Sequence, residues 1–123
     1  EDLGLGDHRA RPVVFLHGYT DSCRSLVPLL DALPRHFRSL APSQRGHGDS
    51  DRPEGVYRIP DMARDVAELL DALGIERAAV VGHSMGGLVA QRFAIDHAAR
   101  ISALVLIGAF PTLRGNGPLT EFR

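Results

Sequence analysis

A serine stands between two glycines directly after a short apolar run, in the stretch VVGHSMGG at residues 80–87. Gly82, Ser84 and Gly86 fit the pattern G-x-S-x-G, which is typical of a nucleophilic serine on a sharp strand-to-helix turn. At such a turn the backbone is strained, and the residues two before and two after the serine pass so close that glycine is needed. The turn would expose the Ser84 hydroxyl and direct the Met85 N–H toward developing negative charge at a helix N-terminus. The alternative is a serine that merely caps a helix after a glycine-rich turn.

The elements that must position this serine follow from the pattern of apolar residues. Strands are predicted at residues 12–16, 36–41, 78–81 and 101–107, and helices at residues 25–33, 60–73 and 84–98. Ser25 is the expected cap of the first helix, and Gly74 ends the second. The segment 42–55 is rich in glycine and proline and is predicted to be a loop. Strands that alternate with helices indicate an α/β fold, with a parallel sheet covered by helices on both faces.

The composition is that of an ordinary globular domain, with 44% hydrophobic and 24% charged residues among 123. A net charge of −1 without basic clusters argues against nucleic acid or a membrane surface as a partner. The single Cys23 excludes an internal disulfide and a multi-cysteine metal site. No apolar run approaches the roughly 20 residues of a membrane-spanning helix. No metal or organic cofactor is implied, and a cytoplasmic location is the default expectation.

Four stretches together resemble the α/β-hydrolase fold superfamily, in its esterase, C–C hydrolase and haloperoxidase-like branch. VVFLHGYTDS is similar to the third strand and oxyanion loop of that family, and SQRGHGDSDRP to the loop after its fourth strand. VVGHSMGGLVAQRFA is similar to the elbow and its helix, and ALVLIGAFP to the sixth strand. The resemblance implies strands 3 to 6 of the family, in the sheet order 4-3-5-6, with the lid and the C-terminal half absent. We therefore expect residues 1–123 to form a single partial domain, truncated at both ends.

Carried over residue by residue, the resemblance makes Ser84 the nucleophile of a serine hydrolase. Met85 would donate one N–H of the oxyanion hole, and Tyr19, which follows His17-Gly18, would donate the other. The haloalkane dehalogenases and epoxide hydrolases of the family use an aspartate nucleophile, so Ser84 argues against those activities. The segment 45–50 is interpreted as shaping its loop rather than as catalytic.

Two positions depart from the family's pattern. The family often has an aspartate where this chain has Ser43, and a tryptophan in the segment that holds Cys23, whereas the chain contains no tryptophan. Both departures could change loop packing without removing the chemistry. Cys23 is expected to pack as a small apolar residue. A solvated face, rather than paired catalytic acids, is expected for the acidic residues of the helix over 60–73: Asp61, Asp65, Glu68 and Asp71.

The partners that a serine nucleophile needs are not found in this sequence. On this fold an acid and a base follow the serine in the order Ser, Asp or Glu, His. The one histidine after Ser84 is His97, about 20 Å away along the same helix at about 1.5 Å per residue. The last strand ends without a carboxylate, and Glu121 lies in the tail beyond it. We expect the 123-residue chain to lack the triad acid and base and to be inactive alone.

The expected function therefore belongs to a parent protein, which would hydrolyse a carboxylic ester or related acyl compound through an acyl-enzyme. The alternative is a non-catalytic protein whose pocket binds a small molecule. The substrate stays open, because esterases, lactonases, thioesterases, C–C hydrolases and perhydrolases share the elbow. In the sheet order 4-3-5-6 the apolar strand 101–107 would be an exposed edge, and we expect the isolated chain to self-associate through such edges.

Overall fold

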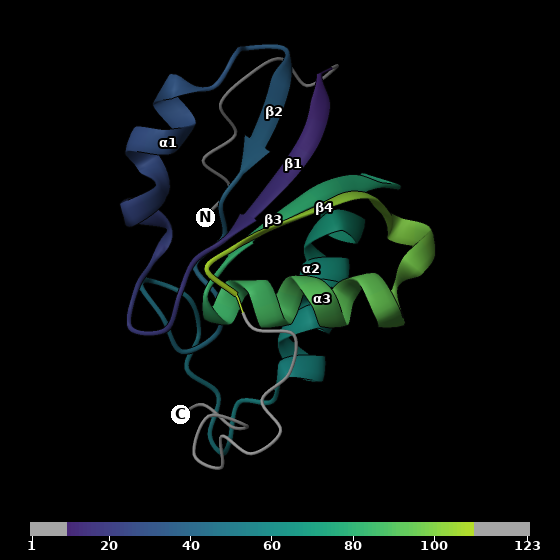
Figure 1. Ribbon diagram of the computed structural model, residues 1–123. Helices are drawn as coiled ribbons and strands as arrows, with labels where there is room; N and C mark the ends of the chain where they lie inside the picture. The colour runs from purple at the N-terminus through teal and green to yellow at the C-terminus, as the bar shows by residue number, and fades with distance from the viewer. Residues whose placement is uncertain (1–9, 110–123) are drawn as a thin grey trace.

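The computed structural model describes residues 10–109, which form a four-stranded parallel sheet with helices on both faces (Figure 1). The strands are β1 (Arg11–Leu16), β2 (Phe37–Leu40), β3 (Ala78–His83) and β4 (Ile101–Ile107). They lie in the order β2-β1-β3-β4, and every neighbouring pair is parallel. Both the predicted sheet and its predicted strand order are confirmed.

The helices separate onto the two faces of this sheet. Helix α1 (Val27–Ala32) lies on one face, whereas α2 (Ile59–Ala72) and α3 (Met85–Asp96) lie on the other (Figure 1). Two short 3₁₀ helices complete the set, η1 (Cys23–Leu26) before α1 and η2 (Ala98–Arg100) before β4. No helix among residues 10–109 is long and apolar enough to cross a bilayer.

Apolar side chains of alternating strand positions form one core cluster on each face. The larger cluster joins β1 and β3 to α2 and α3, and its fully buried members include Val14, Val80, Leu70 and Phe93. The periodicity of α2 explains its place in this cluster, since its apolar residues recur on one face of the helix. The smaller cluster joins Val13 and Phe15 of β1 to α1 and Cys23, which is buried as expected.

Three predicted boundaries were wrong by two residues, and the others differ from the structure by at most one. The first helix begins as η1, capped by Ser22, whose side chain accepts a hydrogen bond from the Arg24 N–H at 3.3 Å. Ser25 is not that cap: its hydroxyl donates to the Ser22 carbonyl oxygen. The third helix ends at Asp96 rather than at residue 98, and β3 continues two residues beyond Val81.

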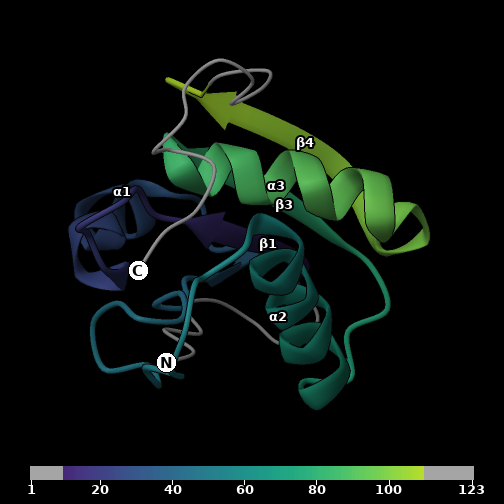
Figure 2. The same ribbon diagram turned by 90° about the horizontal axis from the view of Figure 1, so that it is seen from below.

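The outermost strand β4 leaves apolar side chains uncovered among residues 10–109. Leu104, Val105, Leu106 and Ile107 are between 40% and 47% exposed, and β4 pairs only with β3 (Figure 2). The expected apolar edge at residues 101–107 is therefore confirmed within the described part of the chain.

Candidate active site

Ser84 occupies a strained turn between β3 and α3. Its φ of 53° and ψ of −117° lie outside the regions that residues with a side chain normally adopt. A Cβ at Gly82 would lie 2.3 Å from the Gly86 carbonyl oxygen, and a Cβ at Gly86 would lie 2.2 Å from that of Leu16. These contacts confirm the steric reason for both glycines, because only a residue without Cβ permits them. The predicted strand–turn–helix around the serine is also confirmed.

Backbone hydrogen bonds hold the turn on both sides of Ser84. Its N–H donates to the Ile107 carbonyl oxygen at 3.0 Å, which ties the turn to the end of β4. The Ser84 carbonyl oxygen accepts from the Gly87 N–H at 2.9 Å and begins α3. Met85 is the first residue of this helix, so its N–H has no acceptor within the helix. An N–H in this position can stabilise a negative charge that develops beside the serine.

The loop after β1 approaches the same serine. A Cβ at Gly18 would lie 3.5 Å from the Ser84 Cβ and 3.4 Å from Nδ1 of His83, which are ordinary van der Waals distances. Tyr19 follows Gly18, and its side chain is 47% exposed and meets the ring of His47 edge-on at 6.0 Å. The structure thus brings together the three elements on which Ser84, Met85 and Tyr19 lie, at the carboxyl edge of the sheet.

His17, at the end of β1, is fully buried beside this loop. Burial lowers the pKa of its imidazole, against a hydrogen bond to the Gly18 carbonyl oxygen that raises it. His47, with its ring centroid 5.1 Å away, lowers the pKa further, and Asp21 raises it. The His17 ring is therefore neutral at pH 7.

The segment 42–53 packs against the chain that follows Tyr19 and is hydrogen-bonded to it. Ser43 Oγ accepts a hydrogen bond from the Cys23 N–H at 3.2 Å, so the residue that departs from the family's pattern joins the two loops. A Cβ at Gly48 would lie 2.5 Å from Ser43 Oγ, and Gly48 has a φ of +52°. The Gly46 N–H donates to the Asp51 carbonyl oxygen at 2.9 Å. These contacts agree with a loop-shaping role for residues 45–50.

Arg45 forms a bidentate ion pair with Asp65 of α2. Its Nε and second terminal nitrogen donate to the two carboxylate oxygens at 2.6 and 2.7 Å. This hydrogen-bonded carboxylate raises the pKa of Arg45, against partial burial that lowers it. The predicted solvated acidic face is confirmed for Glu68 and Asp71, which are exposed. Asp61 and Asp65 are only partly exposed, and each forms an ion pair with an arginine. The Arg45–Asp65 pair anchors the loop to α2.

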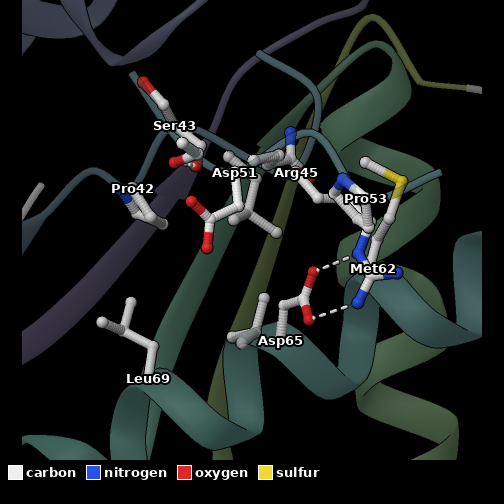
Figure 3. A pocket seen from close by; sticks show the side chains of 12 residues that line it. Pro42, Ser43, Arg45, Asp51, Pro53, Met62, Asp65 and Leu69 are labelled. Atoms are coloured by element: carbon white, nitrogen blue, oxygen red, sulfur yellow. Dashed lines mark hydrogen bonds and ion pairs between the residues drawn. The ribbon is translucent and has the colours of Figure 1, made fainter. Parts of the chain in front are cut away.

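A cavity of about 430 Å³ lies between this loop and α2 (Figure 3). Apolar side chains of Leu16, Met62 and Val66 line it together with polar groups of the loop, and the Arg45–Asp65 pair stands at its wall. Neither Ser84 nor the residues flanking it belong to the lining. The lining of the cavity therefore comes from the end of β1, the loop after β2 and α2, and not from the turn at Ser84.

The structure gives Ser84 no base among the described residues that follow it. His97 lies at the opposite end of α3, where its ring stacks on Phe93 at 5.2 Å. Glu121 falls outside the described residues. No group of three or more His, Cys, Asp or Glu residues within 10–109 is arranged to hold a metal ion.

A family model and a curated relative each match most of this chain. A family model described as the alpha/beta hydrolase fold matches residues 11–122. A soluble epoxide hydrolase of Corynebacterium sp. (strain C12) is 37% identical over 102 residues, which cover 83% of this chain and 36% of that protein.

Two solved structures are similar to this chain in both fold and sequence. A hydrolase from Pseudomonas aeruginosa PA01 superposes with a TM-score of 0.82 at 34% identity, over 93% of this chain and 44% of that one. The enol-lactonase from Burkholderia xenovorans LB400 superposes with a TM-score of 0.77 at 38% identity, over 80% of this chain and 39% of that one. The chain thus spans less than half the length of each of these relatives.

Proposed function

This chain belongs to the alpha/beta hydrolase fold family, and from that premise we propose that the protein hydrolyses a carboxylic ester or related acyl compound, with Ser84 as its nucleophile. The observation that carries the proposal is the strained conformation of Ser84 between two glycines that cannot bear a Cβ. A capping serine does not need this conformation, because helix caps normally have extended backbone angles. Strain retained at one polar residue favours a functional role.

The chemistry would proceed through an acyl-enzyme. The Ser84 hydroxyl attacks the substrate carbonyl carbon and passes its proton to a base, while the carbonyl oxygen gains negative charge. The N–H groups of Met85 and Tyr19 would stabilise this oxyanion. Collapse of the tetrahedral intermediate expels the alcohol, which takes the proton, and water then releases the acid by the same steps in reverse order. The base and its orienting acid would come from a segment beyond residues 10–109.

Hydrolysis of an epoxide is the second candidate, because two relatives named as epoxide hydrolases are 37% and 36% identical to this chain. Ser84 weighs against it, since the epoxide hydrolases of this family use an aspartate nucleophile. A lactone is a cyclic ester, so similarity to an enol-lactonase agrees with the first candidate. Binding of a small molecule without turnover is the third possibility, and it differs from the others in predicting no product.

The test is a comparison of ester and epoxide hydrolysis by the full-length protein and its Ser84→Ala variant. We expect hydrolysis of a p-nitrophenyl ester, no turnover of styrene oxide, and a loss of at least about 10⁴-fold in kcat for Ser84→Ala. Ser25→Ala is the matched control, because Ser25 is exposed and lies on the short helix η1. If Ser84→Ala hydrolysed the ester at the wild-type rate, Ser84 would not be the nucleophile. If the wild-type protein hydrolysed only the epoxide, the second candidate would replace the proposed reaction.

A further inference from the structure

A buried hydrogen-bonded pair connects two loops that are 27 residues apart in the sequence. His17 follows β1, and Gln44 lies in the loop after β2; the side chains of both residues are at least nine-tenths buried. The Gln44 N–H meets Nε2 of His17 at 3.0 Å, and the Gln44 side-chain nitrogen donates to the His17 carbonyl oxygen at 2.8 Å. Gln44 therefore holds both the ring and the backbone of His17.

These contacts determine which nitrogen of the ring carries the proton. A backbone N–H can only donate, so Nε2 of His17 must accept from Gln44. In a neutral imidazole the other nitrogen then bears the hydrogen, and Nδ1 lies 2.8 Å from the Gly18 carbonyl oxygen. Nδ1 of His17 is thus the donor of that hydrogen bond.

The Gly18 carbonyl oxygen is consequently held from two directions. It accepts from His17 Nδ1 and, at 3.3 Å, from the Asp21 N–H. The described part of the chain contains no cis peptide bond, so the carbonyl of Gly18 and the N–H of Tyr19 point in opposite directions within their shared peptide plane. Fixing the carbonyl oxygen therefore fixes the direction of the Tyr19 N–H, away from the His17 ring.

This peptide lies against the nucleophile. A Cβ at Gly18 would be within 3.5 Å of the Ser84 Cβ, so a rotation of the peptide plane here would move an N–H or a carbonyl oxygen beside the serine. An N–H that points toward the space beside Ser84 would stabilise an oxyanion there, whereas a carbonyl oxygen that points the same way would repel it.

The side chain of Gln44 includes a buried polar atom whose burial is unfavourable. Its side-chain oxygen is buried and has no hydrogen-bond partner among the described residues. An apolar side chain of similar volume would avoid this cost, so the donor half of the amide is the part that the position uses. That donor acts on the backbone of His17.

We propose that His17 and Gln44 are positioning residues, which orient the Gly18–Tyr19 peptide so that the Tyr19 N–H faces the oxyanion formed at Ser84. The inference rests on the proposed function, because it assigns a task within the same site. Neither residue touches the substrate: Gln44 fixes the tautomer of His17, and His17 fixes the peptide.

The first test measures the tautomer and is independent of activity. In full-length protein labelled with ¹⁵N-histidine, the ring of His17 should show a protonated Nδ1 and an unprotonated Nε2 at neutral pH. A protonated Nε2 would overturn the inference and leave the proposed function intact.

The second test uses amide side chains that replace one ring nitrogen at a time. Asparagine at position 17 can present a donor near the place of Nδ1, whereas glutamine can present an acceptor near the place of Nε2. We expect His17→Gln to lower kcat for the ester by about tenfold to a hundredfold with KM little changed, because misorienting an oxyanion donor costs less than the loss of about 10²–10³-fold that follows its removal. We expect His17→Asn to retain more of kcat than His17→Gln.

Gln44→Met and His36→Asn complete the series. Gln44→Met keeps the backbone N–H that fixes the tautomer of His17, but it removes the side-chain donor to the His17 carbonyl oxygen. It should lower kcat with little effect on KM. His36 is an exposed histidine in the turn before β2, so His36→Asn should behave as wild type. Equal kcat losses for His17→Asn and His17→Gln, or changes confined to KM, would overturn the inference. If the wild-type protein did not hydrolyse the ester, the proposed function would be overturned. The tautomer measurement would still test whether the His17–Gln44 contacts fix the proton on Nδ1 of His17.

Discussion

Replacement of Gly86 by alanine should destabilise the protein, although helix propensity alone favours the opposite result. Gly86 lies in the first turn of α3, and alanine is preferred over glycine inside helices by about 1 kcal/mol. A Cβ at this position would lie 2.2 Å from the Leu16 carbonyl oxygen and 2.7 Å from that of His17, and both atoms belong to the backbone. Relief of such an overlap requires movement of α3 from the sheet, and overpacking costs about 1–3 kcal/mol, with the upper end expected where the crowding atoms belong to the backbone. The free energy of unfolding should therefore fall by about 2 kcal/mol, which is about 3 kcal/mol of overlap less about 1 kcal/mol of helix propensity.

Chemical denaturation followed by circular dichroism measures this change, with the free energy extrapolated to water and the m-value compared between variants. Gly18→Ala is the matched control, since the nearest atom to its added Cβ would be 3.4 Å away, and its free energy should stay within about 1 kcal/mol of wild type. A Gly86→Ala protein as stable as wild type would refute the argument that the close approach of α3 to β1 requires glycine.

Three further predictions concern stability and association. Burial lowers the pKa of His17 in the folded protein, so on acidification the unfolded chain takes up the proton at a higher pH than the folded chain does. The free energy of unfolding should therefore decrease as the pH is lowered below about 6.5, by at most about 1.4 kcal/mol per pH unit. The same denaturation at several pH values should give a flatter profile for His17→Asn, and parallel profiles would contradict the assignment. Asp65→Asn should lower stability by about 1 kcal/mol, because its pair with Arg45 joins the loop to α2. Asp96→Asn should leave the unfolding midpoint unchanged, because its pair with Arg92 lies within α3 and joins no second segment; equal effects would count against the loop anchor. We also propose that the isolated 123-residue chain self-associates through β4, so Val105→Lys should reduce light scattering more than Ile95→Lys, an exposed apolar position on α3.

The sequence predicts the elements of this fold well where a local pattern has one physical reading. The strand over residues 101–107 is apolar except at Ser102 and has the predicted bounds. Helix α2 follows from one apolar face and from Gly74, which ends it with a φ of +66°. The turn at Ser84 was found because the glycines on either side of it have a steric cause that the spacing alone reveals.

The errors arose where neighbouring residues offered equivalent choices. Ser22 and Ser25 are both good caps, and the deciding contact is the hydrogen bond from the Arg24 N–H to Ser22. Gly82 and His83 were assigned to the turn, but β3 continues through both because β4 pairs with them.

Contacts between distant segments could not be predicted from the sequence. Arg45 and Asp65 are 20 residues apart, and His17 and Gln44 are 27 apart. In each pair, one partner lies in a loop whose path depends on tertiary packing, so no periodicity relates the two. The cavity beside α2 escaped prediction for the same reason.

Labelling with a fluorophosphonate probe, followed by peptide mapping of the full-length protein, tests the central claim most directly. Such probes react with a serine only when its hydroxyl is activated by a base and an oxyanion hole stabilises the adduct. The account predicts a single modified residue, Ser84, and no modification of the Ser84→Ala variant. An unmodified Ser84 in folded full-length protein, or a label on another serine, would contradict the claim that Ser84 is the nucleophile.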